Sequence, residues 1–179
     1  MTIAALIDGV IGREGRYAND PRDAGGETMW GITKRVALEN GYKGSMRDMP
    51  RSTAAAIYRA QYIDKPGFAG IIPISEEIAE ELIDTGVNMG PGRAALFLQQ
   101  ALNALNNQGT DYPDIAEDMD VGPGTIRALK SYLAKRGIEG ERVLLKVLNG
   151  LQVARYVEIA RGRSANEAFM FGWIRTRIS

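Results

Sequence analysis

Three side chains close to the N-terminus have types and spacing suited to cleaving a glycosidic bond, namely Glu14, Asp23 and Thr28. Glu14 and Asp23 lie nine positions apart across a turn-rich segment, so their carboxyl groups can face each other over a cleft. Such hydrolysis needs one acid to protonate the leaving oxygen and a second group that directs water or acts as nucleophile. Thr28 can offer a hydroxyl to the same water. Because Asp and Thr are more often turn formers, spacing alone leaves both interpretations open.

The composition restricts which catalytic groups are available. The 179 residues include no Cys and no His, which excludes Ser-His-Asp and Cys-His mechanisms and removes the commonest zinc ligands. Lys and Arg balance Asp and Glu at 22 each, so the chain has no overall basic field to hold nucleic acid. No stretch approaches the roughly 20 apolar residues that span a bilayer. The apolar run 3–11 is interrupted by Asp8 and lacks a basic leader, which argues against a secretory signal.

The segment expected to position Glu14 is an amphipathic helix over residues 2–14. Apolar residues recur there at spacings of three and four, and Thr2 is the expected N-cap. Glu14 would then lie at the negative end of the helix dipole, which raises the pKa of a carboxyl group. A solvated Glu at a helix end is the alternative, and position alone weighs the two equally.

The rest of the chain has helical periodicity and almost no strand alternation, so the fold is predicted to be mainly α. Turn signals from Gly15 to Gly31 predict an irregular loop or short hairpin after the first helix. A compact polar turn is expected at 87–92 and a polar loop at 106–120. Further helices are predicted up to Glu39 with Thr33 as the N-cap, and from the N-cap Ser52 to just before Pro66. Helices are also predicted at 75–86 and 94–103, and from about Pro123 and Glu139 onward.

Two motifs that suggest ligand sites do not hold. The glycine and threonine spacing of 26–33 is that of a phosphate loop, but Ile32 stands where the phosphate-binding Lys is required. Asp20 and Asp23 lack the alternating acidic ligands and terminal Glu of a calcium-binding EF-hand. The sequence therefore predicts no cofactor and no metal.

The segment 14–33 closely resembles the signature of the phage-type N-acetylmuramidases of glycoside hydrolase family 108, endolysins with a lysozyme-like helical fold. Residues 81–90 look like the end of that family's catalytic lobe. Residues 97–103, followed by 120–125, are similar to the peptidoglycan-binding segment that accompanies these enzymes. The sequence departs from the family at three positions, where the usual Gly, Trp and Gly are replaced by Arg16, Ile63 and Met119.

The resemblance implies a role for each motif residue. Glu14 corresponds to the general acid, with Asp23 and Thr28 positioning the hydrolytic water, which favours Asp23 over Asp20. For the aromatic and amide side chains, loop packing is the alternative to sugar contact. The candidate substrate-binding residues are Tyr17, Asn19, Asp20, Trp30, Tyr58 and Asn88.

The resemblance also implies partners and a place of action. We expect a catalytic muramidase lobe at 1–92 and a helical peptidoglycan-binding-like lobe at 93–179, packed into one globular unit. The expected partner is bacterial peptidoglycan, without nucleic acid or stable membrane association. The chain would be a monomer made in the host cytoplasm that reaches the periplasm and wall after a holin permeabilises the membrane. The alternatives are a non-catalytic wall-binding or structural phage protein and a lytic transglycosylase.

Overall fold

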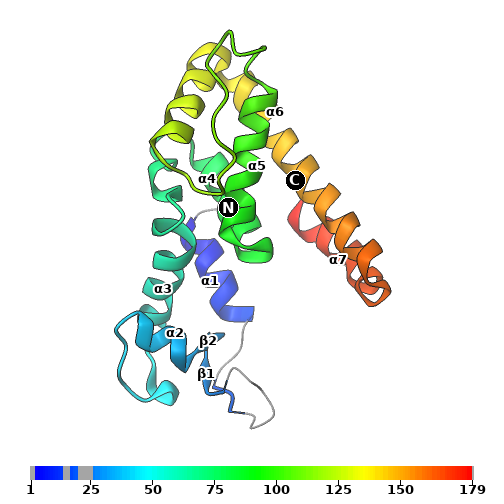
Figure 1. The fold of residues 1–179 in the computed structure, drawn as a ribbon. Helices are drawn as coiled ribbons and strands as arrows, with labels where there is room; N and C mark the ends of the chain where they lie inside the picture. The colour runs from blue at the N-terminus through cyan, green and yellow to red at the C-terminus, as the bar shows by residue number, and fades with distance from the viewer. Residues whose placement is uncertain (1–2, 14–16, 20–25, 179) are drawn as a thin grey trace. The chain divides into compact units, whose positions relative to one another are not determined.

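The computed structural model describes residues 3–13, 17–19 and 26–178 and is mainly α-helical, as predicted (Figure 1). The chain divides into two compact units, Met1–Lys65 and Pro66–Ser179, which are described separately below. Across the described residues, no helix is both long and apolar enough to cross a bilayer. The predicted division at residues 92 and 93 into a catalytic and a wall-binding lobe stays a prediction.

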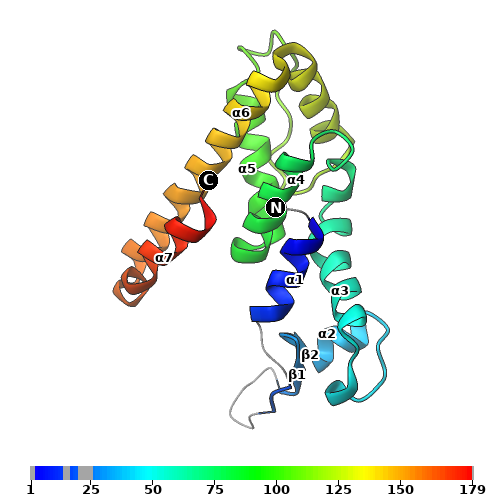
Figure 2. The ribbon, with the colours of Figure 1, turned by 180° about the vertical axis from the view of Figure 1, so that it is seen from behind.

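The first unit contains two longer helices and a small hairpin. Helices α1 and α3 pack side by side (Figures 1 and 2). Leu6, Val10 and Ile11 of α1 are buried, which confirms the predicted apolar face. The elements are α1 (Ile3–Arg13), β1 (Thr28–Met29), β2 (Ile32–Thr33), α2 (Lys34–Glu39), the 3-10 turn η1 (Met46–Asp48), α3 (Arg51–Arg59) and the π-helical turn η2 (Ala60–Asp64).

Local signals set the bounds of the helices in this unit. The Thr33 side chain accepts a hydrogen bond from the backbone N–H of Val36 at 3.3 Å and so caps α2, as predicted. Asn40 ends this helix, and Gly41 follows with a φ of 83°. The prediction that Ser52 caps the next helix is wrong: α3 begins at Arg51 with Pro50 at the N-cap.

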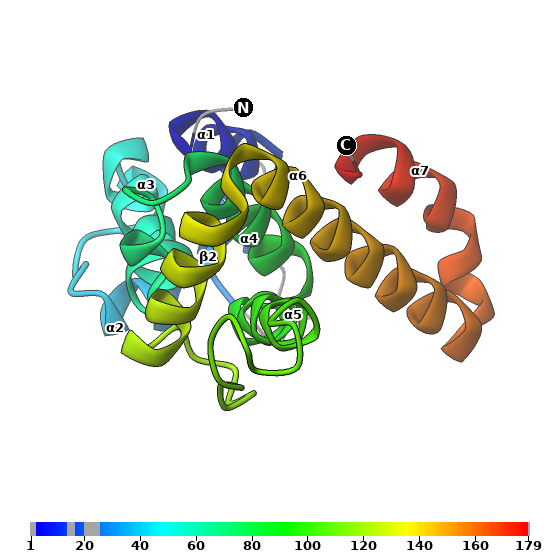
Figure 3. The same cartoon turned by 90° about the horizontal axis from the view of Figure 1, so that it is seen from above.

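The second unit is a helical bundle followed by a long bent helix. Helices α4 and α5 pack side by side, and both contact α6. Helix α7 turns back along α6 (Figures 1 and 3). The elements are the 3-10 turn η3 (Phe68–Gly70), α4 (Glu76–Met89), α5 (Pro91–Ala104), α6 (Pro123–Gly162), the 3-10 turn η4 (Ser164–Asn166) and α7 (Glu167–Arg177).

Helix α4 is longer than the sequence suggests. The helix begins where predicted, and Ser75 caps it through a 3.0 Å hydrogen bond from the Ile78 N–H. The predicted end at Thr85–Gly86 and the predicted turn at 87–92 are wrong, because α4 continues to Met89 and α5 begins at Pro91. Gly86 is buried inside the helix, where a Cβ would make ordinary contacts with Pro91 at 3.4 Å and with the Phe68 ring at 3.5 Å. The chain reverses at Gly90 alone, whose φ of 91° suits glycine.

The polar segment between α5 and α6 is fixed by amide side chains on one face of α5. Gln99 donates to a carboxylate oxygen of Asp118 at 2.7 Å and accepts from the Met119 N–H at 3.0 Å. Asn103 accepts from the Ile115 N–H and donates to the Ile115 carbonyl. Met119, where the related family usually has Gly, has a φ of 67°, a conformation that glycine adopts without steric cost.

Helix α6 bends sharply at Gly137, whose backbone angles (φ 57°, ψ −149°) are not helical. The sequence predicted two helices with a break close to this position. Pro123 occupies the first turn, where its missing N–H leaves no bond unmade. Beyond the bend, Tyr156 stacks on Trp173 of α7 with ring centroids 5.2 Å apart.

Candidate active site

Thr28 connects two parts of the motif, because its backbone pairs with residues on both sides of it in sequence. The backbone of Thr28 pairs with Ala18 through two hydrogen bonds of 3.0 and 2.9 Å, and it pairs on its other side with Thr33 of β2. This pairing of Ala18 with Thr28, ten positions apart in sequence, is called the neck below. The Thr28 hydroxyl has a long 3.5 Å contact to the Ala18 carbonyl. Within the described residues this is its one hydrogen bond, so its oxygen keeps accepting capacity for a water.

The hairpin that carries Thr28 is held by a strained two-residue turn. Trp30 and Gly31 have φ values of 56° and 75°, the combination of a type I′ turn, and the left-handed conformation costs Trp roughly 1–2 kcal/mol. Two hydrogen bonds oppose this cost. The Trp30 indole donates to the Met49 carbonyl at 3.0 Å, and the Trp30 carbonyl accepts from the Tyr58 hydroxyl at 3.0 Å.

A second set of contacts connects the neck of the loop to the hairpin and to η1. The Tyr17 hydroxyl donates to Glu27 at 2.9 Å, and Lys34 pairs with the other oxygen of Glu27 at 3.1 Å. Hydrogen bonds from Lys34 and then from Tyr17 hold the pKa of the Glu27 carboxyl below its usual value. The Arg47 guanidinium lies 4.2 Å from the centre of the Tyr17 ring, a cation–π contact.

The candidate substrate-binding residues of the first unit differ in accessibility. Asn19 is exposed, while Tyr17 and Trp30 are half-buried. Tyr58 is only 8% exposed, and its ring stacks on Tyr62 at 5.8 Å. Tyr58 thus supports the hairpin through its hydrogen bond to the Trp30 carbonyl. Sugar contact by these four residues stays a prediction.

Several predicted residues lie outside the described part of the chain. Glu14, Asp20 and Asp23 are among them, as is Arg16, so their proposed roles stay predictions. Ile63, the residue found in place of the usual Trp, is fully buried within η2. Among the residues that are described, no cluster of three or more His, Cys, Asp and Glu side chains could hold a metal ion.

Asn88 belongs to the second unit and lies in the last turn of α4. Its side-chain amide donates back to the Asp84 carbonyl at 2.7 Å and to the Asp84 carboxylate at 3.3 Å. One turn earlier, Glu81 accepts from the Thr85 hydroxyl at 3.3 Å. Burial, followed by the neighbouring Asp84 charge, raises the pKa of Glu81 to about 7. The final turns of α4 therefore combine an amide with a carboxyl group that titrates near neutrality.

The sequence prediction did not single out Glu81, Glu27 or Arg47. A signal for Glu81 exists in the sequence, because Glu81, Asp84 and Thr85 share one face of α4 between buried apolar positions. Glu27 contacts Tyr17 and Lys34, and Arg47 contacts Tyr17, only because the hairpin and η1 bring these residues together. Arg47 is thirty residues from Tyr17 in sequence, so helical or strand spacing gives no sign of their contact.

Fold, motif and family comparison together define a glycoside hydrolase. Residues 7–90 match the sequence model of glycosyl hydrolase family 108, and residues 93–178 match the model of a family described as a predicted peptidoglycan domain. Residues 7–90 thus form a glycoside hydrolase family 108 region, and a peptidoglycan domain follows it. It is a hydrolase of peptidoglycan.

A solved structure has a similar fold. SagA of Brucella abortus aligns with a TM-score of 0.60 at 23% sequence identity, over 96% of this chain and 87% of that chain. This similarity concerns the fold, which is lysozyme-like and mainly α. Comparison with curated proteins gives no significant match.

Proposed function

We propose that this chain is an endolysin that hydrolyses the β-1,4 bond between N-acetylmuramic acid and N-acetylglucosamine in peptidoglycan. The observation that carries the proposal is the family match over residues 7–90, which includes the whole motif from Glu14 to Thr28. Peptidoglycan as the substrate follows from both halves of the chain. The specific bond, the roles of individual residues and the phage origin are parts of the proposal.

In the proposed reaction, Glu14 donates its proton to the glycosidic oxygen as the bond to the anomeric carbon breaks. Asp23, ionised, and the Thr28 hydroxyl hold a water that attacks this carbon, and Asp23 accepts the water proton. The closed neck at Ala18 and Thr28 supports this role for Thr28, because it fixes the backbone that carries the hydroxyl. We propose inversion at the anomeric carbon, which requires a carboxyl separation of about 6.5–9.5 Å so that water fits between the groups.

The site of action follows from the substrate. We propose that the protein, a monomer, is made in the cytoplasm of a bacterial host and acts on the wall after a holin has permeabilised the membrane. Added protein should then clear cells whose outer membrane has been permeabilised and leave intact cells unaffected. Lysis of cells that express the chain without a holin would contradict the need for a permeabilising partner.

Release of reducing ends from purified sacculi tests the residue assignments. Glu14→Gln should lower the rate by about 100- to 10,000-fold, the usual contribution of a general acid. Thr28→Val should cause a smaller loss, and Thr28→Ser should restore most of the rate because it keeps the hydroxyl. A Glu14→Gln variant with nearly normal turnover would overturn the assignment. If Asp23→Ala and Thr28→Ala both remained fully active, the role of holding water would move to Asp20.

A further inference from the structure

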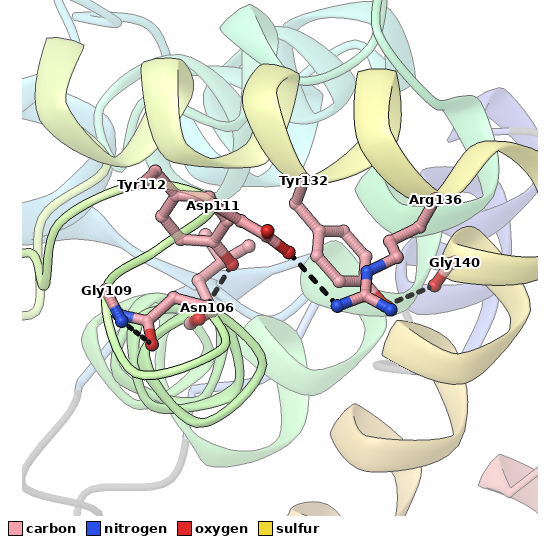
Figure 4. A network of polar contacts seen from close by, with 8 residues as sticks. Asn106, Gly109, Asp111, Tyr112, Tyr132, Arg136 and Gly140 are labelled. Carbon is pink, nitrogen blue, oxygen red and sulfur yellow. Dashed lines mark hydrogen bonds and ion pairs between the residues drawn. The ribbon is translucent and has the colours of Figure 1, made fainter.

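The bend in α6 forms a cavity in the second unit that the proposed reaction does not use. The helix bends at Gly137. Tyr132, before the bend, donates a hydrogen bond from its hydroxyl to the Gly140 carbonyl at 2.8 Å (Figure 4). Gly140 cannot carry a side chain here, because a Cβ would lie 2.2 Å from the Cβ of Arg136. The cavity has a volume of about 320 Å³, within the range of small-molecule sites. It is lined by Leu105, Tyr132, Arg136, Glu139, Gly140 and Val143.

One positive and one negative side chain contribute to the lining. Arg136 is half-exposed and uses one N–H group to pair at 3.0 Å with Asp111, whose side chain is only 4% exposed (Figure 4). A guanidinium has five N–H donors, so most of its capacity remains. Glu139 is exposed and forms no hydrogen bond or ion pair with any other described residue. The cavity thus has two complementary groups in its lining. The Glu139 carboxylate can bind a cation, and the Arg136 guanidinium can donate hydrogen bonds to a carboxylate.

The surroundings fix the orientation of the guanidinium. Tyr112 lies beside Asp111 and donates its hydroxyl to the Leu102 carbonyl at 2.7 Å. Burial above all raises the pKa of Tyr112 to about 12, and burial also raises the pKa of Tyr132. Both hydroxyls therefore stay protonated and keep donating at neutral pH. The Asp111 carboxylate pairs with Arg136 of α6 and so orients the guanidinium before any ligand binds.

We propose that this cavity binds the free α-amino-acid end of a diaminopimelate residue in the peptide stems of peptidoglycan. That end carries an ammonium and a carboxylate on one carbon, which matches Glu139 and Arg136, three residues apart on the two sides of the bend at Gly137. The apolar side chains of Leu105 and Val143 can cover the methylene chain of the ligand. A lysine stem has the ammonium but lacks this carboxylate. The cavity would therefore distinguish diaminopimelate walls from lysine walls.

This inference rests on the proposed action on peptidoglycan and is tested by direct binding. The full chain is titrated calorimetrically with the soluble tripeptide L-Ala-γ-D-Glu-meso-diaminopimelate and with its lysine counterpart. We expect the diaminopimelate peptide to bind at least about tenfold more tightly, because only this peptide carries a carboxylate on the same carbon as the side-chain ammonium, so that Arg136 and Glu139 can bind the two groups together. Equal affinity for the two peptides, or no binding of either, would overturn the proposal.

Three variants locate the binding. Glu139→Gln should weaken the diaminopimelate peptide by about tenfold, and Val143→Phe should block the cavity without removing any hydrogen bond. Arg136→Lys keeps a positive charge for the buried Asp111 but loses the planar fork, so it should lower affinity in a folded protein. Arg127→Gln is the matched control, since Arg127 is exposed on α6 outside the cavity and should bind normally. Unchanged affinity in both Glu139→Gln and Val143→Phe would overturn the assignment.

Release of reducing ends from sacculi, measured on the same preparations, separates this proposal from the proposed function. A chain that binds the peptide through the cavity but releases no reducing ends would contradict the hydrolysis and support the binding site. A chain that hydrolyses sacculi but binds neither peptide would support the hydrolysis and overturn the binding site.

Discussion

The partly buried carboxyl group of Glu81 should make the second unit less stable as the pH rises. Burial raises its pKa from an ordinary value of 4.5 to about 7 in the folded chain. Below about pH 4.5 both the folded and the unfolded chain carry a protonated Glu81, so the group makes no difference there. Between about pH 4.5 and about pH 7 the unfolded chain ionises first, and the free energy of unfolding falls. A pKa difference of about 2.5 corresponds to a loss of up to about 3 kcal/mol above pH 7.

Glu81→Gln should remove this loss, because an amide stays neutral at every pH and its oxygen can still accept from Thr85. The free energy of unfolding is measured by urea titration with circular dichroism, at several values between about pH 5 and about pH 8. The difference between the variant and the original chain should grow in favour of the variant as the pH rises. Glu77→Gln, an exposed position on the same helix, should show no such trend. Parallel curves for Glu81→Gln and the original chain would refute the reasoning.

Three further substitutions test the packing account by urea unfolding. Thr33→Ala removes the cap of α2 and should cost about 1 kcal/mol, whereas Thr33→Ser should cost little; equal losses would argue against the cap. Tyr58→Phe deletes the hydrogen bond to the carbonyl of the strained Trp30 turn and should cost about 1 kcal/mol, and no loss would mean that this bond does not support the turn. Gln152→Met should stabilise the chain by about 1–3 kcal/mol, because both polar atoms of this fully buried amide lack a partner in the described structure; destabilisation would indicate a bridging water.

Local signals in the sequence were sufficient for much of the helical architecture. Thr33, Ser75 and Pro123 mark helix starts correctly because capping and first-turn geometry depend on neighbouring residues only. The end of α4 was predicted at Thr85–Gly86, three residues before its actual end at Met89, because Gly86 lies inside the helix. A glycine inside a helix and one that ends a helix look alike in sequence, so local signals could not decide this boundary.

The candidate site shows the same division between local and long-range information. A short hairpin after the first helix follows from the Gly and Asn content of the motif, and Thr28 does lie on its first strand. The cation–π contact between Arg47 and Tyr17 and the elevated pKa of Glu81 depend on burial and on distant segments. The positions of Glu14 and Asp23 lie outside the described residues, so their roles depend on the family resemblance and on experiment.

The masses of the muropeptides released from purified sacculi test the central claim most directly. If Glu14, Asp23 and Thr28 act as proposed, the products should end in a hydrated, reducing N-acetylmuramic acid, and Glu14→Gln should release almost none. Products ending in anhydro-muramic acid would show a lytic transglycosylase, which forms its product without the positioned water. Products with a reducing N-acetylglucosamine end, or binding to sacculi without any release, would contradict the account.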